Sequence, residues 1–231
     1  MSRFRALLRW DVTVQWRQGL YFAAAFVAAI WAVLLPQLPP AAREEILPYA
    51  LFMDISVIGF YFMAGVLFLE KNDGVLAALV VTPLRRGEYL LSKVVSMTLL
   101  ALVASSAVVL LVHGWRLNWG LLLLGVAINA WVMILLGFWL ASRYAGISDF
   151  LVPSLVYMAP SQLPALVYFG VSHAWFLYLI PTQPAMVLLE AAFRPVPAWQ
   201  LLYAVSYGLL ACAVVAWLAV RAYERFVVRS T

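Results

Sequence analysis

Charged residues are scarce in this sequence. They make up 11% of its 231 residues, whereas 66% are hydrophobic. Soluble domains have about 25% charged and about 45–50% apolar residues, so one soluble core of this size cannot bury the excess. The length accommodates six membrane spans of about 20 residues each, with short connections. The composition therefore predicts an all-α, polytopic membrane protein, with a single transmembrane domain over residues 1–231.

Cysteine and the common catalytic motifs are also missing. Cys212 is the single cysteine, so the chain has no intrachain disulfide and no C-x-x-C redox or zinc site. The sequence contains no G-x-x-x-x-G-K-[ST] phosphate loop, no H-E-x-x-H zinc motif and no G-x-S-x-G nucleophile elbow. We therefore expect no enzyme activity, no metal site and no cofactor bound by this chain itself.

The basic residues outnumber the acidic ones and give a net charge of +5, but they sit beside the apolar runs and not on a separate polar domain. This distribution favours membrane lipids over nucleic acid as the partner. Residues 1–18, MSRFRALLRWDVTVQWRQ, place four apolar side chains on one side of a helix, with Asp11 in the middle of that side. We expect an interfacial helix held by apolar contacts and by arginines on anionic lipid. The alternative is a frayed basic tail.

Six apolar runs are long enough to cross a bilayer. We expect the spans at about Leu20–Leu35, Tyr49–Leu69, Val94–Val112, Trp119–Ala141, Phe150–Gly170 and Gln200–Val220. The proline-rich segment PQLPPAAREE between the first two runs is expected to be a loop, because its prolines disfavour a continuous helix.

The segment 171–199 is apolar, but prolines divide it into pieces that are each too short to cross alone. We expect an outer re-entrant region of two short helices, which dip into the membrane from one side or lie on its surface. Thr182 can cap the second helix, with Pro184 in its first turn.

Lysine and arginine are distributed unevenly along this topology. With the N-terminus in the cytoplasm, six spans place twelve basic residues on the inner side and three on the outer side. A seventh crossing within 171–199 would weaken this bias to nine against six. The sequence therefore predicts six spans in a bacterial plasma (inner) membrane, with both termini in the cytoplasm.

Residues 70–93, EKNDGVLAALVVTPLRRGEYLLSK, lie between the second and third expected spans. The central part, Val75–Val81, is at most two helical turns long and apolar on all sides, so it needs burial on two surfaces. One surface is the membrane domain, and the other is either lipid headgroups or a groove on a soluble partner. An Asp-Gly pair can reverse the chain before this part, and a Thr-Pro pair can end it.

The stretch LEKNDGVLAALVVTPLRRGEYLLSKV resembles the first cytoplasmic loop of ABC-2-type transporter permeases, the membrane subunits of type V exporters. The expected layout of an interfacial helix, six spans and re-entrant helices also resembles that of these permeases. In length and loop sequence, the chain also resembles small drug-exporting permeases, including those for fluoroquinolone export. Val80 and Val81 depart from the Leu or Met of many relatives. The residues that match the loop pattern are Glu70, Gly74, Leu76, Leu79, Thr82, Pro83, Leu84, Arg86, Gly87, Glu88 and Lys93.

The resemblance implies that residues 70–93 form a cytoplasmic coupling helix docked in a groove of a separate ABC ATPase subunit. Two permeases, identical or paralogous, and two ATPases then make the working unit, with ATP and Mg²⁺ held by the ATPases. The absence of a phosphate loop from this sequence is consistent with ATP binding by the separate ATPase subunits. The residues expected at the ATPase contact are Glu70, Asp73, Gly74, Val75, Leu76, Leu79, Thr82, Pro83, Leu84, Arg85, Arg86, Gly87 and Glu88.

The resemblance also implies a substrate path along the second and fifth spans, at the permease–permease interface. Aromatic and methionine side chains with few charges suit an amphipathic or lipid-like cargo, although each can instead serve packing or face lipid. The candidate path residues are Phe52, Asp54, Phe60, Tyr157, Met158 and Gln162.

The chain is therefore expected to be the permease subunit of an ATP-driven ABC exporter. Two alternatives stay open. One is a non-transporting scaffold whose loop recruits a cytosolic protein, and the other is an ion-coupled carrier that uses Asp54. Asp54 is expected about one and a half turns into the second span, near the outer face.

Overall fold

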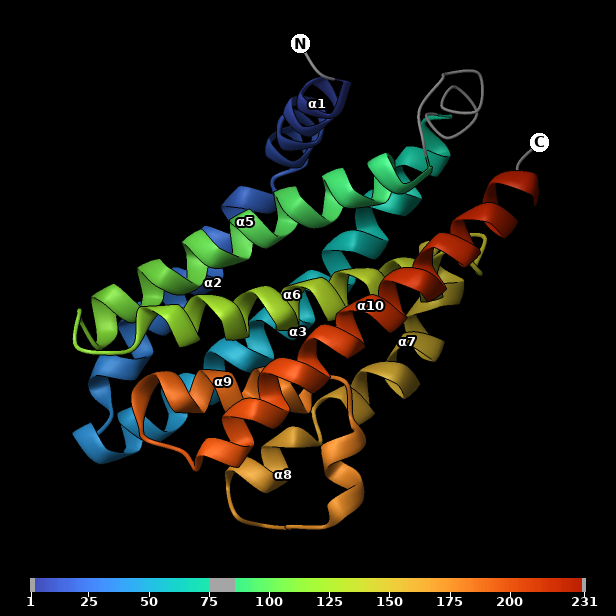
Figure 1. Ribbon diagram of the computed structural model, residues 1–231. Coiled ribbons are helices and arrows are strands. Elements are labelled where there is room, and N and C mark those ends of the chain that lie inside the picture. Colours follow the sequence, from blue (N-terminus) through green and yellow to red (C-terminus); the bar gives the residue numbers. More distant parts are fainter. Residues whose placement is uncertain (1–2, 75–85, 230–231) are drawn as a thin grey trace.

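The computed structural model describes residues 3–74 and 86–229, and all regular structure in this part of the chain is helical (Figure 1). In chain order the elements are α1 (Arg3–Arg17), α2 (Leu20–Leu34), the 3₁₀ helix η1 (Leu35–Gln37), α3 (Pro40–Asn72), α5 (Arg86–Val112), α6 (Trp119–Ala141), α7 (Ile147–Ser161), α8 (Pro164–Tyr168), the 3₁₀ helix η2 (Trp175–Leu179), α9 (Gln183–Phe193) and α10 (Ala198–Arg229).

Six described segments are long and apolar enough to cross a membrane. They are Leu20–Gln37, Pro40–Asn72, Gly87–Val112, Trp119–Ala141, Ile147–Tyr168 and Ala198–Tyr223. α9 is apolar, but its 11 residues extend only about 16 Å, about half of the hydrocarbon thickness of a bilayer. The predictions of an all-α membrane protein and of six spans are confirmed.

α3 and α6 form the centre of the bundle and make the most extensive contact between any two described elements (Figure 1). In their apolar windows 61% and 67% of the residues are buried, compared with 17% and 22% for the spans formed by α2 and α10. The helices α2, α7 and α10 therefore lie at the periphery, where their apolar side chains need lipid or protein to cover them.

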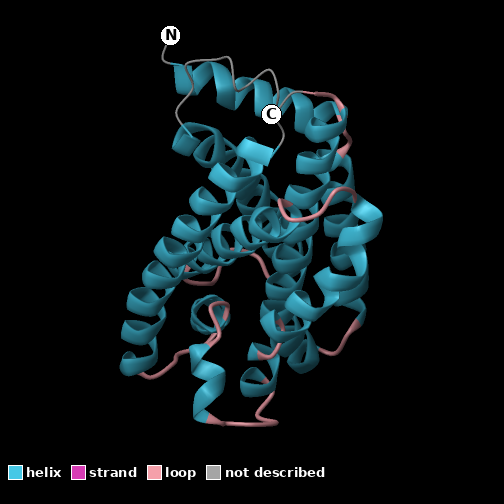
Figure 2. Cartoon of the chain, turned by 90° about the vertical axis from the view of Figure 1, so that its right-hand side faces the viewer, coloured by secondary structure: helices cyan, strands magenta, loops and turns pink. Residues whose placement is uncertain are grey.

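The molecule has two distinct ends (Figures 1 and 2). α1, the last turn of α3, the first turn of α5 and the C-terminal part of α10 lie together at one of them. We call it the basic end, because its described residues include Arg5, Arg9, Arg17, Lys71, Lys93, Arg143 and Arg221. η1, α8, η2 and the connection between α5 and α6 lie at the opposite end.

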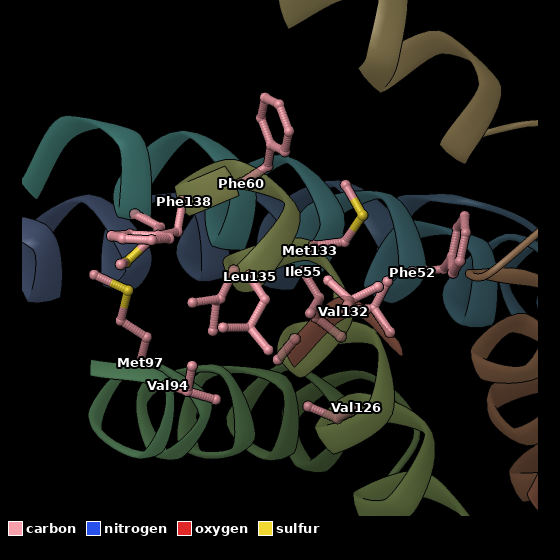
Figure 3. Close-up of a cluster of buried hydrophobic side chains, with 14 of the residues drawn as sticks. Phe52, Ile55, Phe60, Val94, Met97, Val126, Val132, Met133, Leu135 and Phe138 are labelled. Atoms are coloured by element: carbon pink, nitrogen blue, oxygen red, sulfur yellow. The ribbon is translucent and has the colours of Figure 1, made fainter. Parts of the chain in front are cut away.

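The core between α3, α5 and α6 consists of interdigitated aliphatic, aromatic and methionine side chains (Figure 3). Phe52, Phe60, Met133 and Phe138 are almost completely buried there. Apolar side chains gain little by leaving lipid for protein, so close packing and hydrogen bonds hold membrane helices together.

The backbones of α3 and α6 approach each other most closely at Gly137. A Cβ atom at this position would lie 2.4 Å from the carbonyl oxygen of Phe60, so the crossing leaves no room for a side chain. A polar contact lies on the same interface. The Asn129 amide donates hydrogen bonds to the carbonyl oxygen of Phe52 and to the hydroxyl of Ser56, both at 3.0 Å. Small residues and interhelical hydrogen bonds thus join the two central helices.

α3 is longer than the predicted second span. The prediction that the whole segment PQLPPAAREE is a loop is wrong, because its part from Pro40 onward belongs to α3. The helix begins at Pro40 and continues through Pro48, whereas the prediction started it at Tyr49. Pro40 occupies the first helical position, where a missing N–H is harmless. Pro48 removes one backbone hydrogen bond but is buried against neighbouring elements, the setting in which membrane helices tolerate proline.

The segment 171–199 contains η2 and α9, both of which precede α10. Pro184 lies in the first turn of α9, as predicted, and Thr182 precedes this helix. The prediction that the Thr182 side chain caps α9 is wrong. Its backbone is helical and not extended, and its hydroxyl donates to the carbonyl oxygen of Ser161 at 2.7 Å instead. This hydrogen bond joins the start of α9 to the end of α7.

The Gly137 crossing gives a stability prediction. Gly137→Ala forces the two central helices apart and should lower the free energy of unfolding by about 1–3 kcal/mol, seen as a lower melting temperature in detergent. Gly65→Ala is the matched control on α3, because a Cβ atom there meets nothing within 4 Å. Equal melting temperatures for the two variants would contradict the close crossing.

Candidate functional site

A buried ion network lies at the basic end, where three helices meet. The Lys93 ammonium on α5 is 3.0 Å from a carboxylate oxygen of Asp11 on α1 and 2.5 Å from a carboxylate oxygen of Glu70 on α3. The side chains of Lys93, Asp11 and Glu70 are only 1%, 4% and 6% exposed. One cation therefore joins two anions from different helices, away from water.

Two hydroxyl groups complete the ion network. Tyr89 donates a hydrogen bond to the second carboxylate oxygen of Glu70 at 2.5 Å, and Ser92 donates to the carboxylate of Asp11. The Lys93 ammonium also lies over the Tyr89 ring, 4.8 Å from its centroid. Three ions with a net charge of −1 are costly to bury, and these hydroxyl donors offset part of the cost.

Helical spacing explains how the sequence builds this network. Residues spaced by three and four positions share one face of a helix, and α5 has four polar residues in that pattern. We call them the polar stripe: Tyr89, Ser92, Lys93 and Ser96. Asp11 and Gln15 face the polar stripe from α1, one turn apart, and the Gln15 amide donates to the Ser96 hydroxyl at 2.6 Å.

α1 is thus attached to the bundle in a way that the sequence prediction missed. The prediction assigned its attachment to apolar contacts and to arginines on anionic lipid, with Asp11 as an imperfection in the apolar side. In the structure Asp11 and Gln15 are the buried residues of α1, whereas Trp10 and Trp16 are exposed. The signal was present: a carboxylate in the middle of an apolar side predicts a buried cationic partner.

The segment 70–93 was expected to contact an ATPase, and the structure describes part of it. The Glu70 side chain faces inward to Lys93, so it holds the base of this segment and does not point outward. Asp73 and Gly74 form an exposed turn, with Gly74 at a φ of 68°. Gly87 is exposed and Glu88 is half-buried in the first turn of α5. The following expected contact residues lie outside the described residues: Val75, Leu76, Leu79, Thr82, Pro83, Leu84 and Arg85, together with the side chain of Arg86.

A second contact holds the end of α3 at the basic end. The Lys71 ammonium donates hydrogen bonds to the carbonyl oxygens of Tyr144 and Ala145, at 3.3 and 3.0 Å. These carbonyls belong to the connection between α6 and α7. The last turn of α3 is therefore bound on one side to α1 and α5, and on the other side to the α6–α7 connection.

The predicted substrate path of the second and fifth spans does not form a continuous surface. Phe52 and Phe60 are buried within the chain, and the Phe60 ring stacks on Phe150 of α7, with 5.8 Å between ring centroids. Met158 is also buried, and so packs inside the chain instead of lining a path. In the structure, all three of these side chains thus pack inside the chain.

The other predicted path residues lie on three different surfaces. Tyr157 is exposed on α7 and contacts the Trp139 ring edge-on, with 5.7 Å between ring centroids. Gln162 is half-buried at the break between α7 and α8. Asp54 lies on another face of α3, in a crevice between α2, α3, α5 and α6. The structure therefore does not bring these three residues together.

Asp54 lies further from the start of its helix than predicted. The helix starts at Pro40, so Asp54 is fourteen residues from its beginning and eighteen from its end at Asn72. The side chain of Trp31 on α2 interacts with its carboxylate. Among the described residues, no group of three or more His, Cys, Asp and Glu side chains is arranged to hold a metal ion.

Comparison with known proteins matches residues 2–231 to the model of the "Fluoroquinolones export permease protein family". The chain belongs to this family. Two proteins named "Fluoroquinolones export permease protein", from the CDC 1551 and H37Rv strains of Mycobacterium tuberculosis, are each 35% identical to this permease over 234 aligned residues. The alignments cover 99% of this permease and 98% of each relative.

Membership of this family and the six apolar helices identify the protein as a multi-pass membrane permease for export. The predicted resemblance to drug-exporting permeases is confirmed. The ion network lies at the basic end of this permease, and the Asp54 crevice lies among the helices that form its apolar spans.

The ion network gives a prediction about stability. Lys93→Met leaves two buried carboxylates without their cation and should cost about 3–5 kcal/mol, measured as loss of folded protein in detergent. The triple variant Asp11→Asn, Glu70→Gln and Lys93→Met removes all three charges and should recover most of that loss. If the triple variant is no more stable than Lys93→Met, the three charges do not act as one buried unit.

Proposed function

We propose that this permease is the membrane subunit of an ATP-driven exporter and that residues 70–93 couple it to a separate ATPase subunit. The observation that carries the proposal is the ion network, which joins the two flanks of residues 75–85 to each other and to α1. ATP and Mg²⁺ then belong to the partner, since the sequence contains no phosphate loop.

The ion network gives this coupling a physical basis. A partner that moves residues 75–85 moves the end of α3 and the start of α5 together, because separating Glu70 from Lys93 would leave buried charges unpaired. α1 follows through Asp11. α3 and α5 are also two of the four helices that line the Asp54 crevice, so the motion has a direct path into the membrane-spanning part.

We further propose that the working unit contains two permease chains, either identical or paralogous, surrounded by membrane lipids. Its cargo is amphipathic, in line with the fluoroquinolones in the names of both relatives. Support for the second chain comes from the exposed apolar side chains of the peripheral helices, which need a cover of protein or lipid. They include Phe22 and Phe26 on α2, Val152 and Val156 on α7, and Leu202 on α10.

The basic end is proposed to face the cytoplasm of a bacterium, with the protein in its plasma membrane. The excess of lysine and arginine at this end supports the assignment. Arg143 and Arg221 lie over the rings of Trp139 and Trp217, each 3.7 Å from the ring centroid. Stacked arginine–tryptophan pairs near the ends of apolar spans suit the headgroup region of a membrane.

Two charges placed in the central part of the coupling segment test the proposed function. Leu76→Asp together with Leu79→Asp should abolish co-purification with a P-loop ATPase and ATP-driven transport in vesicles, because an apolar contact cannot bury two carboxylates. Val171→Asp is the control, because Val171 is 72% exposed at the opposite end. Intact assembly and transport in the double variant would exclude the coupling role.

The outcome also separates the alternative functions. A scaffold would lose its partner in the Leu76, Leu79 double variant, yet the wild type would show no ATP-driven flux. An ion-coupled carrier would transport without ATP, would stop when the ion gradient is removed and would depend on Asp54.

Accessibility of engineered cysteines tests the orientation. In a Cys212→Ala background, Val171→Cys should react with a membrane-impermeant maleimide on intact cells. Asp73→Cys, in the exposed turn after α3, should react only in inverted vesicles. The reverse pattern would place the basic end outside the cell.

A further inference from the structure

Asp54 is the only charged residue in the middle third of any of the six described spans. The apolar part of α3 begins at Ile46, and Asp54 lies eight residues, or about 12 Å, inside it. In a hydrocarbon core about 30 Å thick, that position is near the midplane. A carboxylate at such a depth is expensive to maintain and usually serves a function.

The carboxylate lies in a crevice between α2, α3, α5 and α6. The crevice contains about 430 Å³ of space not filled by atoms, part of which is open to solvent. Besides Asp54, the walls carry the Ser105 hydroxyl, the Phe62 ring, the Met97 thioether and aliphatic side chains. The space therefore combines one anionic group with apolar and aromatic walls.

The charge of Asp54 is not balanced by the walls around it. None of the described residues that line the crevice is basic. The Trp31 side chain interacts with the carboxylate, but a carboxylate can accept about four hydrogen bonds. An anion with spare acceptor capacity in a low-dielectric site favours a cationic ligand with N–H donors.

The chemistry of the walls selects among cations. Calcium and magnesium take six or more oxygen ligands, and one carboxylate with one hydroxyl falls short of that number. An organic ammonium group needs fewer acceptors, and the walls supply the Asp54 carboxylate and the Ser105 hydroxyl. Its apolar body can contact Phe62 and Met97, which are suited to amphipathic ligands.

We propose that this crevice binds the protonated amine of an amphipathic cargo, with Asp54 as its counter-ion. This inference rests on the proposed export function and narrows its cargo to amines. It retains Asp54 from the predicted path along the second and fifth spans, but places the recognition site in the crevice that α3 shares with α2, α5 and α6.

Equilibrium binding to the purified permease in lipid nanodiscs, without an ATPase, tests the site. The two probes are ciprofloxacin, whose piperazine nitrogen is protonated, and N-acetylciprofloxacin, whose nitrogen is not; empty nanodiscs give the lipid background. The wild type should bind ciprofloxacin about tenfold or more tightly than the acetylated probe, the size of a charge-assisted hydrogen bond. Asp54→Asn should remove this preference, and Asp54→Glu should retain part of it.

Two further variants separate recognition from folding. Asp149→Asn neutralises an exposed carboxylate in the first turn of α7 and should keep the wild-type preference. Ala101→Phe fills the crevice without changing any charge and should weaken binding of both probes. Melting temperatures of all variants are measured in the same nanodiscs.

The proposal is overturned if the wild type binds both probes equally, or if folded Asp54→Asn keeps the preference. It is also overturned if Ala101→Phe binds both probes as the wild type does. ATP-driven flux is measured separately in vesicles that contain an ATPase. Amine-selective binding without such flux would support the site and overturn the proposed export function.

Discussion

The structure of the basic end depends on one buried ammonium group shared by two carboxylates. Lys93 is held between Asp11 and Glu70, and each of these residues comes from a different helix. In a membrane protein, apolar packing gives little preference for one helix arrangement over another, since lipid tails are as apolar as the side chains. Buried charges do give a preference, because each misplaced helix would leave an unpaired ion.

This constraint explains why α1 belongs to the bundle. Its exposed tryptophans and arginines suit a membrane surface, but its position is determined by Asp11 and Gln15 against the polar stripe. The same ion network closes the base of residues 70–93, with Glu70 on one flank and Lys93 on the other. A segment anchored in this way can transmit movement in both directions, which the proposed coupling to an ATPase requires.

In the part of the chain that the structure describes, the central helices α3 and α6 are held together without buried ions, unlike the helices at the basic end. α3 and α6 are joined by a crossing without a side chain at Gly137 and by the Asn129 hydrogen bonds, and this pair is the rigid centre of the bundle. α2 is much less buried than either of them, although it contributes Trp31 to Asp54. Of the four helices that line the crevice, α3 and α6 are firmly packed and α2 is loosely packed, which would let the proposed cargo enter and leave without disrupting the core.

The sequence by itself determined the class of the protein and most of its topology. An apolar run of about 20 residues crosses lipid as a helix. Lipid offers no hydrogen-bond partners, and in a helix the backbone polar groups bond to one another within the run. The six spans followed, and the limits of α6 were predicted to the residue. The loop pattern ending at Lys93 also pointed to the export permeases to which the chain belongs. α3 was predicted less well, because the cost of Pro48 depends on neighbours that a local pattern does not contain.

Only the tertiary structure decided what the polar residues do. Asp11, Glu70 and Lys93 are far apart in the chain, and no spacing rule relates α1 to α5, so their meeting depended on how the helices pack. The same holds for the burial of Phe52 and Phe60, which the sequence could not separate from path-lining residues. On a helix that is apolar all round, the pattern shows no preferred face, and the neighbours determine which side chains are enclosed. Asp54 likewise lies well inside α3, fourteen residues from its start, because the helix continues across a proline.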